Sequence, residues 1–306
     1  MRFAATLQTG LRSAVLILGL LAVAGTSASA AGRVPYGQGI LWKIERPGVA
    51  PNYLLGTMHV NDPRVRNLPA PVRAAFNRAE RAVFEIIITD DVRRQSSEMR
   101  VLPESRALDE ILGPQLFDEL AAMAEEAGMS RDMLRRLKPW AAVMAFQFRQ
   151  AEFARSYMGE LPLDQWLQSN ARSRNVPVLE LETVQEQLGV FDDMAEADQV
   201  AMLRDGLAKA RAPEDDIEIM TQRYVARDIG AIYTEFQEGI DESSGTYARA
   251  FATRFIDDRN QTMVDRMQGF LRQGGTFVAV GALHLPGDQG ILRLLQRQGY
   301  SIVRAY

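Results

Sequence analysis

The 306-residue chain carries 35 lysines and arginines against 39 aspartates and glutamates, which makes a formal net charge of -4 at pH 7. This mild acidity, with arginines scattered along the chain, argues against a nucleic-acid partner. The chain has no cysteine, which excludes disulfides, a thiol nucleophile, a cysteine metal site and a thiol-linked lipid anchor. Its 47% hydrophobic content is ordinary for a packed globular protein.

Residues 1–30 have the pattern of an export signal. Arg2 and Arg12 precede an apolar stretch at 14–25, and small residues follow up to Ala30. That stretch is well short of the roughly 20 residues that a bilayer span needs. We therefore predict a signal peptide cleaved after Ala30 and a periplasmic or secreted protein with no stable membrane span. The alternative is an uncleaved membrane anchor.

Strand patterns concentrate at the two ends of the remaining chain. They lie at 40–44, 53–55, 82–88, 176–181, 276–280 and 301–305. From about 105 to 274 the pattern is helical, interrupted only by the strand near 176–181. We therefore predict one domain over 31–306 of the α/β class, in an α+β-like arrangement. Its mixed sheet would be built from both ends of the chain, with a helical insertion between them.

Both histidines of the chain end the same motif, a glycine followed by two residues and a histidine. Gly56 and His59 follow one predicted strand, Gly281 and His284 follow another, and helical patterns come next at 71–81 and 288–298. Two histidines would share this context by chance roughly once in 200 sequences. Because ligands bind at the edge of open α/β sheets, the pair predicts a functional site. The alternative for each is a buried histidine bonded to a backbone carbonyl.

Glutamates stand in or beside two of the predicted strands. Glu85 interrupts an otherwise apolar strand, so its carboxylate needs a cation, a metal or a strong donor beside it. An ion pair with an arginine is the alternative to a metal role. Glu180 and Glu182 alternate onto one face of their strand, and a capping box at Thr183 and Glu186 then starts a helix. Glu182 is therefore at a strand end, either as a ligand or as an exposed carboxylate.

Arg259 interrupts an apolar row on the predicted helix at 244–271, and Asn260 lies next to it. The apolar members of that row, spaced by four, are Phe251, Phe255, Met263 and Met267. A guanidinium in such a stripe normally pairs with a carboxylate or an anionic substrate. The alternative is a side chain that extends to solvent.

Two histidines with one or two glutamates form a mixed nitrogen and oxygen ligand set, which suits Zn, Mn, Co or Fe. An ion held in this way lowers the pKa of water and polarises a carbonyl, while a free glutamate takes up the proton. The set therefore predicts hydrolysis. No HExxH, GxSxG or P-loop pattern in the sequence supports another hydrolase class.

Six segments carry a resemblance to a known family. In chain order they are Leu55-Gly56-Thr57-Met58-His59-Val60, Val83-Phe84-Glu85, Leu163-Asp164-Gln165-Trp166-Leu167, Leu181-Glu182-Thr183, Arg259-Asn260 and Val280-Gly281-Ala282-Leu283-His284-Leu285-Pro286-Gly287. They resemble the TraB/GumN family, which is related to the Tiki proteins. The resemblance implies a mixed α/β core with helical insertions and, for Tiki members, a Mn- or Co-dependent metallopeptidase.

The resemblance also implies site residues. The metal ligands would come from His59, His284, Glu85 and Glu182, and the catalytic candidates are Glu85, Glu182, Arg259 and Asn260. The sequence thus predicts an exported metal-dependent hydrolase of the peptidase type, with a divalent ion as cofactor and a peptide or small molecule as substrate. One alternative is a non-catalytic envelope protein that holds iron, haem or another ligand with the same histidines. Another is a structural helper in envelope or polysaccharide assembly.

Overall fold

The computed structural model describes residues 34–60, 62–126, 128–146, 161–210, 216–243 and 245–306. The predicted signal peptide and its cleavage site after Ala30 lie outside these residues. Within the described ranges, none of the helices combines the length and the apolar character that a bilayer span requires.

Six strands form one mixed sheet in the order β4-β3-β5-β2-β1-β6. Their bounds are β1 Leu41–Glu45, β2 Asn52–Thr57, β3 Arg81–Phe84, β4 Val178–Glu180, β5 Thr276–Gly281 and β6 Ser301–Arg304. The four strands from β4 to β2 are parallel, whereas β1 is antiparallel to both of its neighbours. The structure thus confirms the predicted α/β class, with a mixed sheet built from both ends of the chain.

One strand is shorter than predicted. The apolar run at 82–88 leaves the sheet after Phe84, so Glu85 lies just beyond β3 rather than within it. Side chains take the backbone donors that follow: Ile87 N donates to Glu180 Oε2 at 3.0 Å, and Ile88 N donates to Gln168 Oε1 at 3.2 Å. With these N–H groups satisfied elsewhere, the ladder ends at Phe84.

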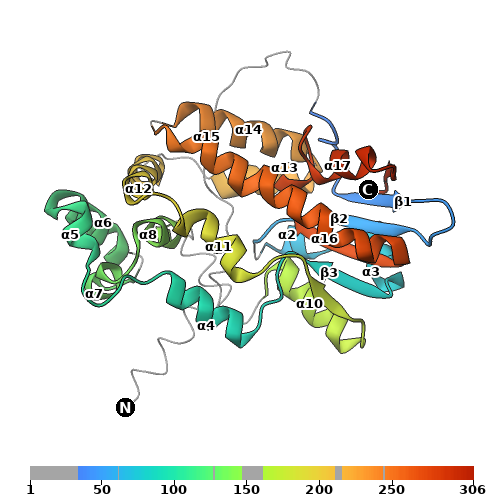
Figure 1. Cartoon of the computed structure of the whole chain (residues 1–306), viewed down its shortest axis with the longest axis horizontal. Coiled ribbons are helices and arrows are strands. Elements are labelled where there is room, and N and C mark those ends of the chain that lie inside the picture. The colour runs from blue at the N-terminus through green and yellow to red at the C-terminus, as the bar shows by residue number, and fades with distance from the viewer. Residues whose placement is uncertain (1–33, 61, 127, 147–160, 211–215, 244) are drawn as a thin grey trace.

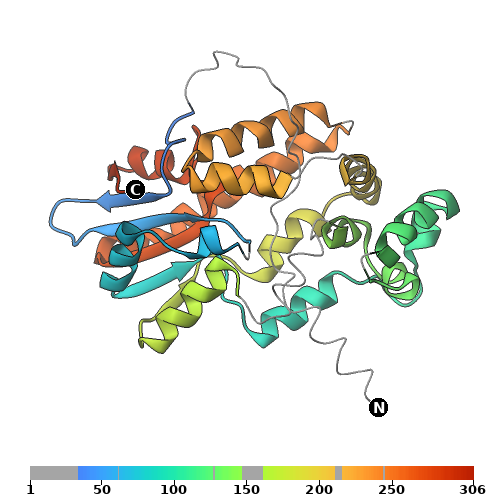
Figure 2. The ribbon, with the colours of Figure 1, turned by 180° about the vertical axis from the view of Figure 1, so that it is seen from behind.

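Helices cover both faces of the sheet. Helices α3 (Ala70–Arg78) and α10 (Leu163–Ser173) pack on one face, and α16 (Arg259–Gln273) and α17 (Ile291–Arg297) pack on the other (Figures 1 and 2). Apolar side chains from both faces of the strands are therefore buried, as a sheet covered on both sides requires. Phe84 and Phe277 are at most 1% exposed.

The other helices lie mostly to the left of the sheet in Figure 1, where α11 packs against α4 and α12 against α8. In chain order they are α2 Pro63–Arg66, α4 Asp90–Met99, α5 Leu108–Leu112, α6 Pro114–Glu126, α7 Arg131–Arg135, α8 Pro139–Phe146, α11 Val184–Asp192, α12 Glu196–Ala210, α13 Asp216–Val225, α14 Ile229–Glu242 and α15 Tyr247–Ala252.

The helix predicted over 244–271 contains a π-helical turn. Helix α15 runs into a π-helical stretch, Thr253–Asp258, and α16 begins at Arg259. The apolar row survives this insertion, since Phe251, Phe255, Met263 and Met267 are all buried. Single π turns inside helices occur frequently at functional sites, and this one directly precedes Arg259.

Candidate functional site

The candidate residues follow four neighbouring parallel strands. His59 follows β2, His284 follows β5, Glu85 follows β3 and Glu182 follows β4. The strand ends are in register: Thr57 of β2 is opposite Gly281 of β5, and Phe84 of β3 is opposite Ala279. Because parallel strands end at the same edge, the four side chains converge on the carboxyl edge of the sheet, where open α/β sheets bind ligands.

The first motif glycine lets the two motifs pack together. A Cβ at Gly56 would lie 2.8 Å from Leu285 Cδ1 and 3.0 Å from Ala282 Cα, so the Leu285 side chain and the Ala282 backbone would have to shift. The Gly56 carbonyl accepts a hydrogen bond from the buried Tyr224 hydroxyl at 2.7 Å. Glycine is therefore required by close approach of the 3₁₀ turn Ala282–His284 that carries the second histidine.

Asp164 orients the first imidazole. His59 Nδ1 lies 2.6 Å from Asp164 Oδ2, and Thr57 Oγ1 donates to Asp164 Oδ1 at 2.7 Å. Burial opposes protonation of His59, but the charge and hydrogen bond of Asp164 outweigh it, so the pKa of His59 is raised. The charge of His59 in turn keeps the pKa of Asp164 below its ordinary value despite burial. In neutral His59, the proton stays on Nδ1 and Nε2 keeps its lone pair.

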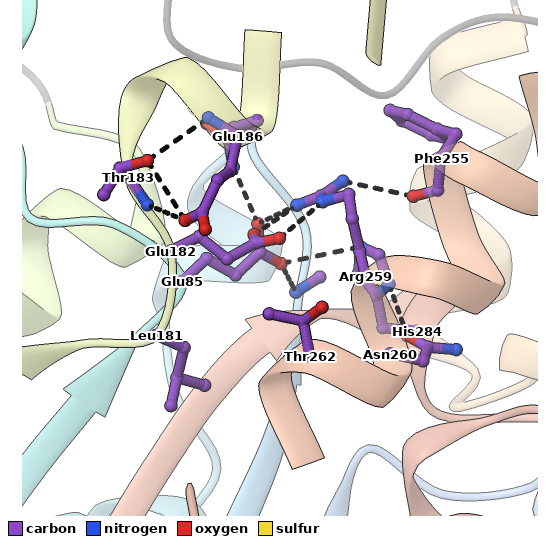
Figure 3. Close-up of polar contacts among 12 residues, drawn as sticks. Glu85, Leu181, Glu182, Thr183, Glu186, Phe255, Arg259, Asn260, Thr262 and His284 are labelled. Atoms are coloured by element: carbon purple, nitrogen blue, oxygen red, sulfur yellow. Dashed lines mark hydrogen bonds and ion pairs between the residues drawn. The ribbon is translucent and has the colours of Figure 1, made fainter. Parts of the chain in front are cut away.

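Asn260 orients the second imidazole. Its Nδ2 donates to the Gln289 carbonyl at 2.8 Å, so Oδ1 faces His284 Nδ1 at 2.7 Å (Figure 3). An amide oxygen only accepts, which makes Nδ1 of His284 the protonated nitrogen and leaves Nε2 with a lone pair. Burial, with the nearby Arg259 charge, places the pKa of His284 well below its ordinary value. His284 is therefore a neutral imidazole at physiological pH.

Arg259 joins the two glutamates. Its Nε and NH2 donate to Glu182 Oε1 and Oε2 at 2.8 and 2.7 Å, and NH2 also donates to Glu85 Oε2 at 3.2 Å (Figure 3). The three side chains are buried, Glu182 most deeply at 1% exposure. The ring of Phe255, in the π-helical turn, lies 5.5 Å from the guanidinium carbon. The bidentate contact to Glu182 fixes the plane of the guanidinium, and thereby the position of Glu85.

Glu85 lies among Gly281, His284, Gln187 and Arg259. Its Oε1 accepts a hydrogen bond from Gly281 N at 2.5 Å and lies 3.9 Å from His284 Nε2. Its Oε2 accepts from Gln187 Nε2 at 3.1 Å, in addition to Arg259. The charge of Glu85 also helps to raise the pKa of His59. This carboxylate is therefore the link between the two motifs.

The structure brings the six predicted residues together at one edge of the sheet, where Glu85 forms the ion pair with an arginine that was the alternative to its metal role. Both histidines bond to side chains rather than backbone carbonyls, Glu182 is buried rather than exposed, and Arg259 pairs inside the core rather than extending to solvent. Glu180, predicted on the same face as Glu182, is exposed.

Two residues of the cluster had no predicted role. Asp164 stands in the first turn of α10 between the fully buried Leu163 and Leu167, and Gln187 on α11 is 6% exposed. A carboxylate on the apolar face of a helix was the available signal for Asp164. Gln187 carries no comparable signal, since amides are common on helices.

In the part of the chain that the structure describes, no group of three or more histidine, aspartate and glutamate side chains is arranged to hold a metal ion. His284 Nε2 nevertheless lies 3.9 Å from Glu85 Oε1, and the charges of Glu85 and Arg259 act on His59, so nitrogen and oxygen donors share this region. Formally, the three carboxylates of Glu85, Glu182 and Asp164 outnumber the two cations beside them, the Arg259 guanidinium and the His59 imidazolium. Gln187 Oε1, beside Glu85, is buried without a hydrogen-bond partner. A cation would balance the excess of negative charge and would give Gln187 Oε1 a partner.

Together, the fold and the edge cluster define an α/β protein with Gly-x-x-His motifs at two neighbouring strand ends. The sequence model of the TraB/PrgY/gumN family matches residues 40–304. The chain belongs to this family, which confirms the predicted resemblance.

Individual relatives are distant. The uncharacterized protein YbaP of Shigella flexneri is 22% identical over 253 residues, covering 83% of this chain and 90% of that protein. The metalloprotease TIKI1 of Danio rerio is 22% identical over 310 residues, covering 86% of this chain and 62% of the relative. The metalloprotease TIKI2 of the same organism is 23% identical, with 86% and 60% covered. No solved structure matches the chain at a significant level.

Proposed function

We propose that this protein is an exported, metal-dependent hydrolase that acts on peptides, with His59, His284 and Glu85 holding its divalent ion. One observation carries the proposal: Asp164 and Asn260 bond to Nδ1 of the two histidines, so in each deprotonated imidazole Nε2 is the nitrogen with the lone pair. Histidine ligands of metals characteristically use their second nitrogen in this way. The similarity to two metalloproteases supports the same reading.

The donor spacing supports the choice of Glu85. Ligand atoms that each lie about 2.1 Å from one ion are separated by roughly 3 to 4 Å. His284 Nε2 and Glu85 Oε1 are 3.9 Å apart. Imidazole and carboxylate suit Mn, Co, Zn and Fe, and the resemblance to Tiki members favours Mn or Co. When bound, such an ion supplies an electrophile that lowers the pKa of water and polarises a carbonyl.

The other residues of the cluster position Glu85 and His284. Glu182 takes both Nε and NH2 of Arg259, so it positions the guanidinium rather than facing the histidines. Arg259 and the Gly281 N–H then hold the Glu85 carboxylate from opposite sides. Asn260 holds His284 as the Nδ1–H tautomer. In this proposal Glu85 is a ligand, Glu182 and Arg259 are positioning residues, and Asn260 orients a ligand.

Metal analysis of the purified protein tests the proposal. Elemental analysis and titration with Mn, Co, Zn and Fe are expected to show a bound ion in the wild type. His59→Ala and His284→Ala are expected to lose both the ion and the cleavage of a peptide library. Arg249→Ala, an exposed variant, serves as the control.

Two results would contradict the proposal. One is a wild type without metal, together with histidine variants that leave metal-supplemented cleavage unchanged. The other is a haem absorption band that disappears in His59→Ala, with no hydrolysis in either protein, which would support the ligand-binding alternative.

A further inference from the structure

Helix α4 carries a row of buried polar groups that lack partners. Arg93, Ser96 and Arg100 are spaced by three and four residues, which places them on one face of the helix. Ser96 Oγ and Arg100 Nε and NH2 are buried without a hydrogen-bond partner, as is Arg93 Nε, although Arg93 is 31% exposed and its NH1 pairs with Asp90 at 3.5 Å. Ser96 is 1% exposed and Arg100 is 8% exposed. Because every one of these groups can donate, the row is a set of unsatisfied donors.

Arg100 at the end of the helix has no carboxylate partner among the described residues. The Arg100 carbonyl accepts a hydrogen bond from Lys138 N at 2.8 Å, which brings the start of α8 beside it. The Lys138 side chain, however, takes both oxygens of Asp192 at 2.6 and 2.9 Å, and Trp140 Nε1 shares Oδ1 at 2.9 Å. Asp192, at the end of the packed helix α11, is thus engaged by Lys138 and Trp140.

A buried guanidinium without a counter-charge is costly to the fold. Burial alone lowers the pKa of Arg100 to about 10, so the group stays charged at neutral pH. The planar fork of an arginine matches the paired oxygens of a carboxylate or phosphate group. Such a group would satisfy Nε and NH2 of Arg100 together, and Ser96 Oγ lies one turn away along the same face.

We propose that this face of α4 is an oxyanion-binding site, in which Arg100 and Ser96 receive a carboxylate or phosphate group. The site is separate from the edge cluster. Helix α4 begins at Asp90, close to Glu85 in the chain, and Arg100 lies at its far end, about 15 Å along the helix axis. The proposal therefore stands independently of the metal site.

Anion titrations of the wild type and two variants test the proposal. Thermal midpoints and calorimetric affinities are measured at constant ionic strength, with inorganic phosphate in one series and N-acetylalanine in the other. At least one anion is expected to raise the wild-type midpoint, because a ligand that binds only the folded state stabilises it. Arg100→Met is expected to weaken that binding by at least about tenfold, since charge-assisted hydrogen bonds are lost. Without anion, this variant should melt no lower than the wild type.

Matched variants keep the test decisive. Arg94→Met removes an arginine from the exposed face of the same helix, where it pairs with Asp91, and should bind anions as the wild type does. Ser96→Ala tests the site without removing a charge and should weaken binding several-fold. A response to phosphate alone or to N-acetylalanine alone supports the site and identifies its ligand. The proposal is overturned if neither anion shifts the wild-type midpoint, or if Arg100→Met responds as the wild type does.

Discussion

His59 Nδ1 lies 2.6 Å from Asp164 Oδ2, although 105 positions separate the two residues in the chain. The matching histidine, His284, contacts the neutral amide of Asn260 instead. Two imidazoles that end identical motifs are thus held by different chemistry. The charged partner helps to raise the pKa of His59, whereas burial and Arg259 lower that of His284.

Asp164→Asn is expected to lower the pKa of His59, because the variant removes the charge that favours the imidazolium. It should also weaken metal affinity about 10- to 100-fold, the usual effect of losing a carboxylate behind a histidine ligand. NMR titration of the metal-free protein follows the two histidines individually. Asp118→Asn, which changes an exposed carboxylate, is the control. An unchanged His59 pKa would refute the assigned role of Asp164.

Arg259→Met is expected to destabilise the fold by about 3 to 5 kcal/mol, because it leaves two buried carboxylates without their cation. Arg259→Lys should lose less stability, since lysine keeps the positive charge but not the bidentate fork. Urea unfolding measures both changes. The control is Arg249→Met, which breaks an ion pair whose arginine is 83% exposed and should cost under about 1 kcal/mol. Equal losses of stability in Arg259→Met and Arg249→Met would show that the buried ion pairs of Arg259 contribute no more to stability than an exposed one.

Gly56→Ala is expected to cost about 1 to 3 kcal/mol, because the added methyl group would press on Leu285 and on the backbone of Ala282. A displaced Ala282 should also weaken metal binding, because His284 follows Ala282 by only two positions. Gly269→Ala is the matched control: its Cβ would meet nothing within 4 Å, and alanine favours a helix interior. Calorimetric unfolding compares the two. A Gly56→Ala protein as stable as Gly269→Ala would mean that the motifs are not packed this closely.

Glu186→Gln is expected to show a loss of stability that depends on pH. Hydrogen bonds from Arg266, supported by Thr183, lower the pKa of Glu186 from 4.5 to about 2. A lowered pKa in the folded state stabilises the protein above about pH 4.5, and this contribution is lost as the pH falls toward 2. The side chain is 41% exposed, so solvent screening limits the contribution to about 1 kcal/mol.

Unfolding of the wild type and Glu186→Gln at pH 7, 4.5 and 3 provides the measurement. The difference between the two proteins should narrow as the pH decreases. Glu104→Gln, an exposed substitution without a capping role, should show no such trend. A difference that stays constant from pH 7 to 3 would exclude the ion pair as its source.

Local patterns predicted most of the fold. Strands β1, β2, β5 and β6 begin and end within about two residues of the predicted ranges, because alternation and β-branched content act over neighbouring residues. The end of β3 and the π-helical turn were not predictable in the same way. Strand β3 ends where Glu180 and Gln168, 93 and 80 positions away, take the N–H groups of Ile87 and Ile88.

By itself, the sequence determined that two glycine and histidine motifs follow strands and that Glu85 and Arg259 interrupt apolar patterns, because these features are local. Only the tertiary structure decided the partners. The strand order β4-β3-β5-β2 is not the chain order, and it brings Glu85 to the backbone of Gly281 across 196 positions. The same ordering pairs Glu182 with Arg259 and leaves Glu85 beside His284. No periodicity encodes these pairings, because they depend on which distant elements pack together.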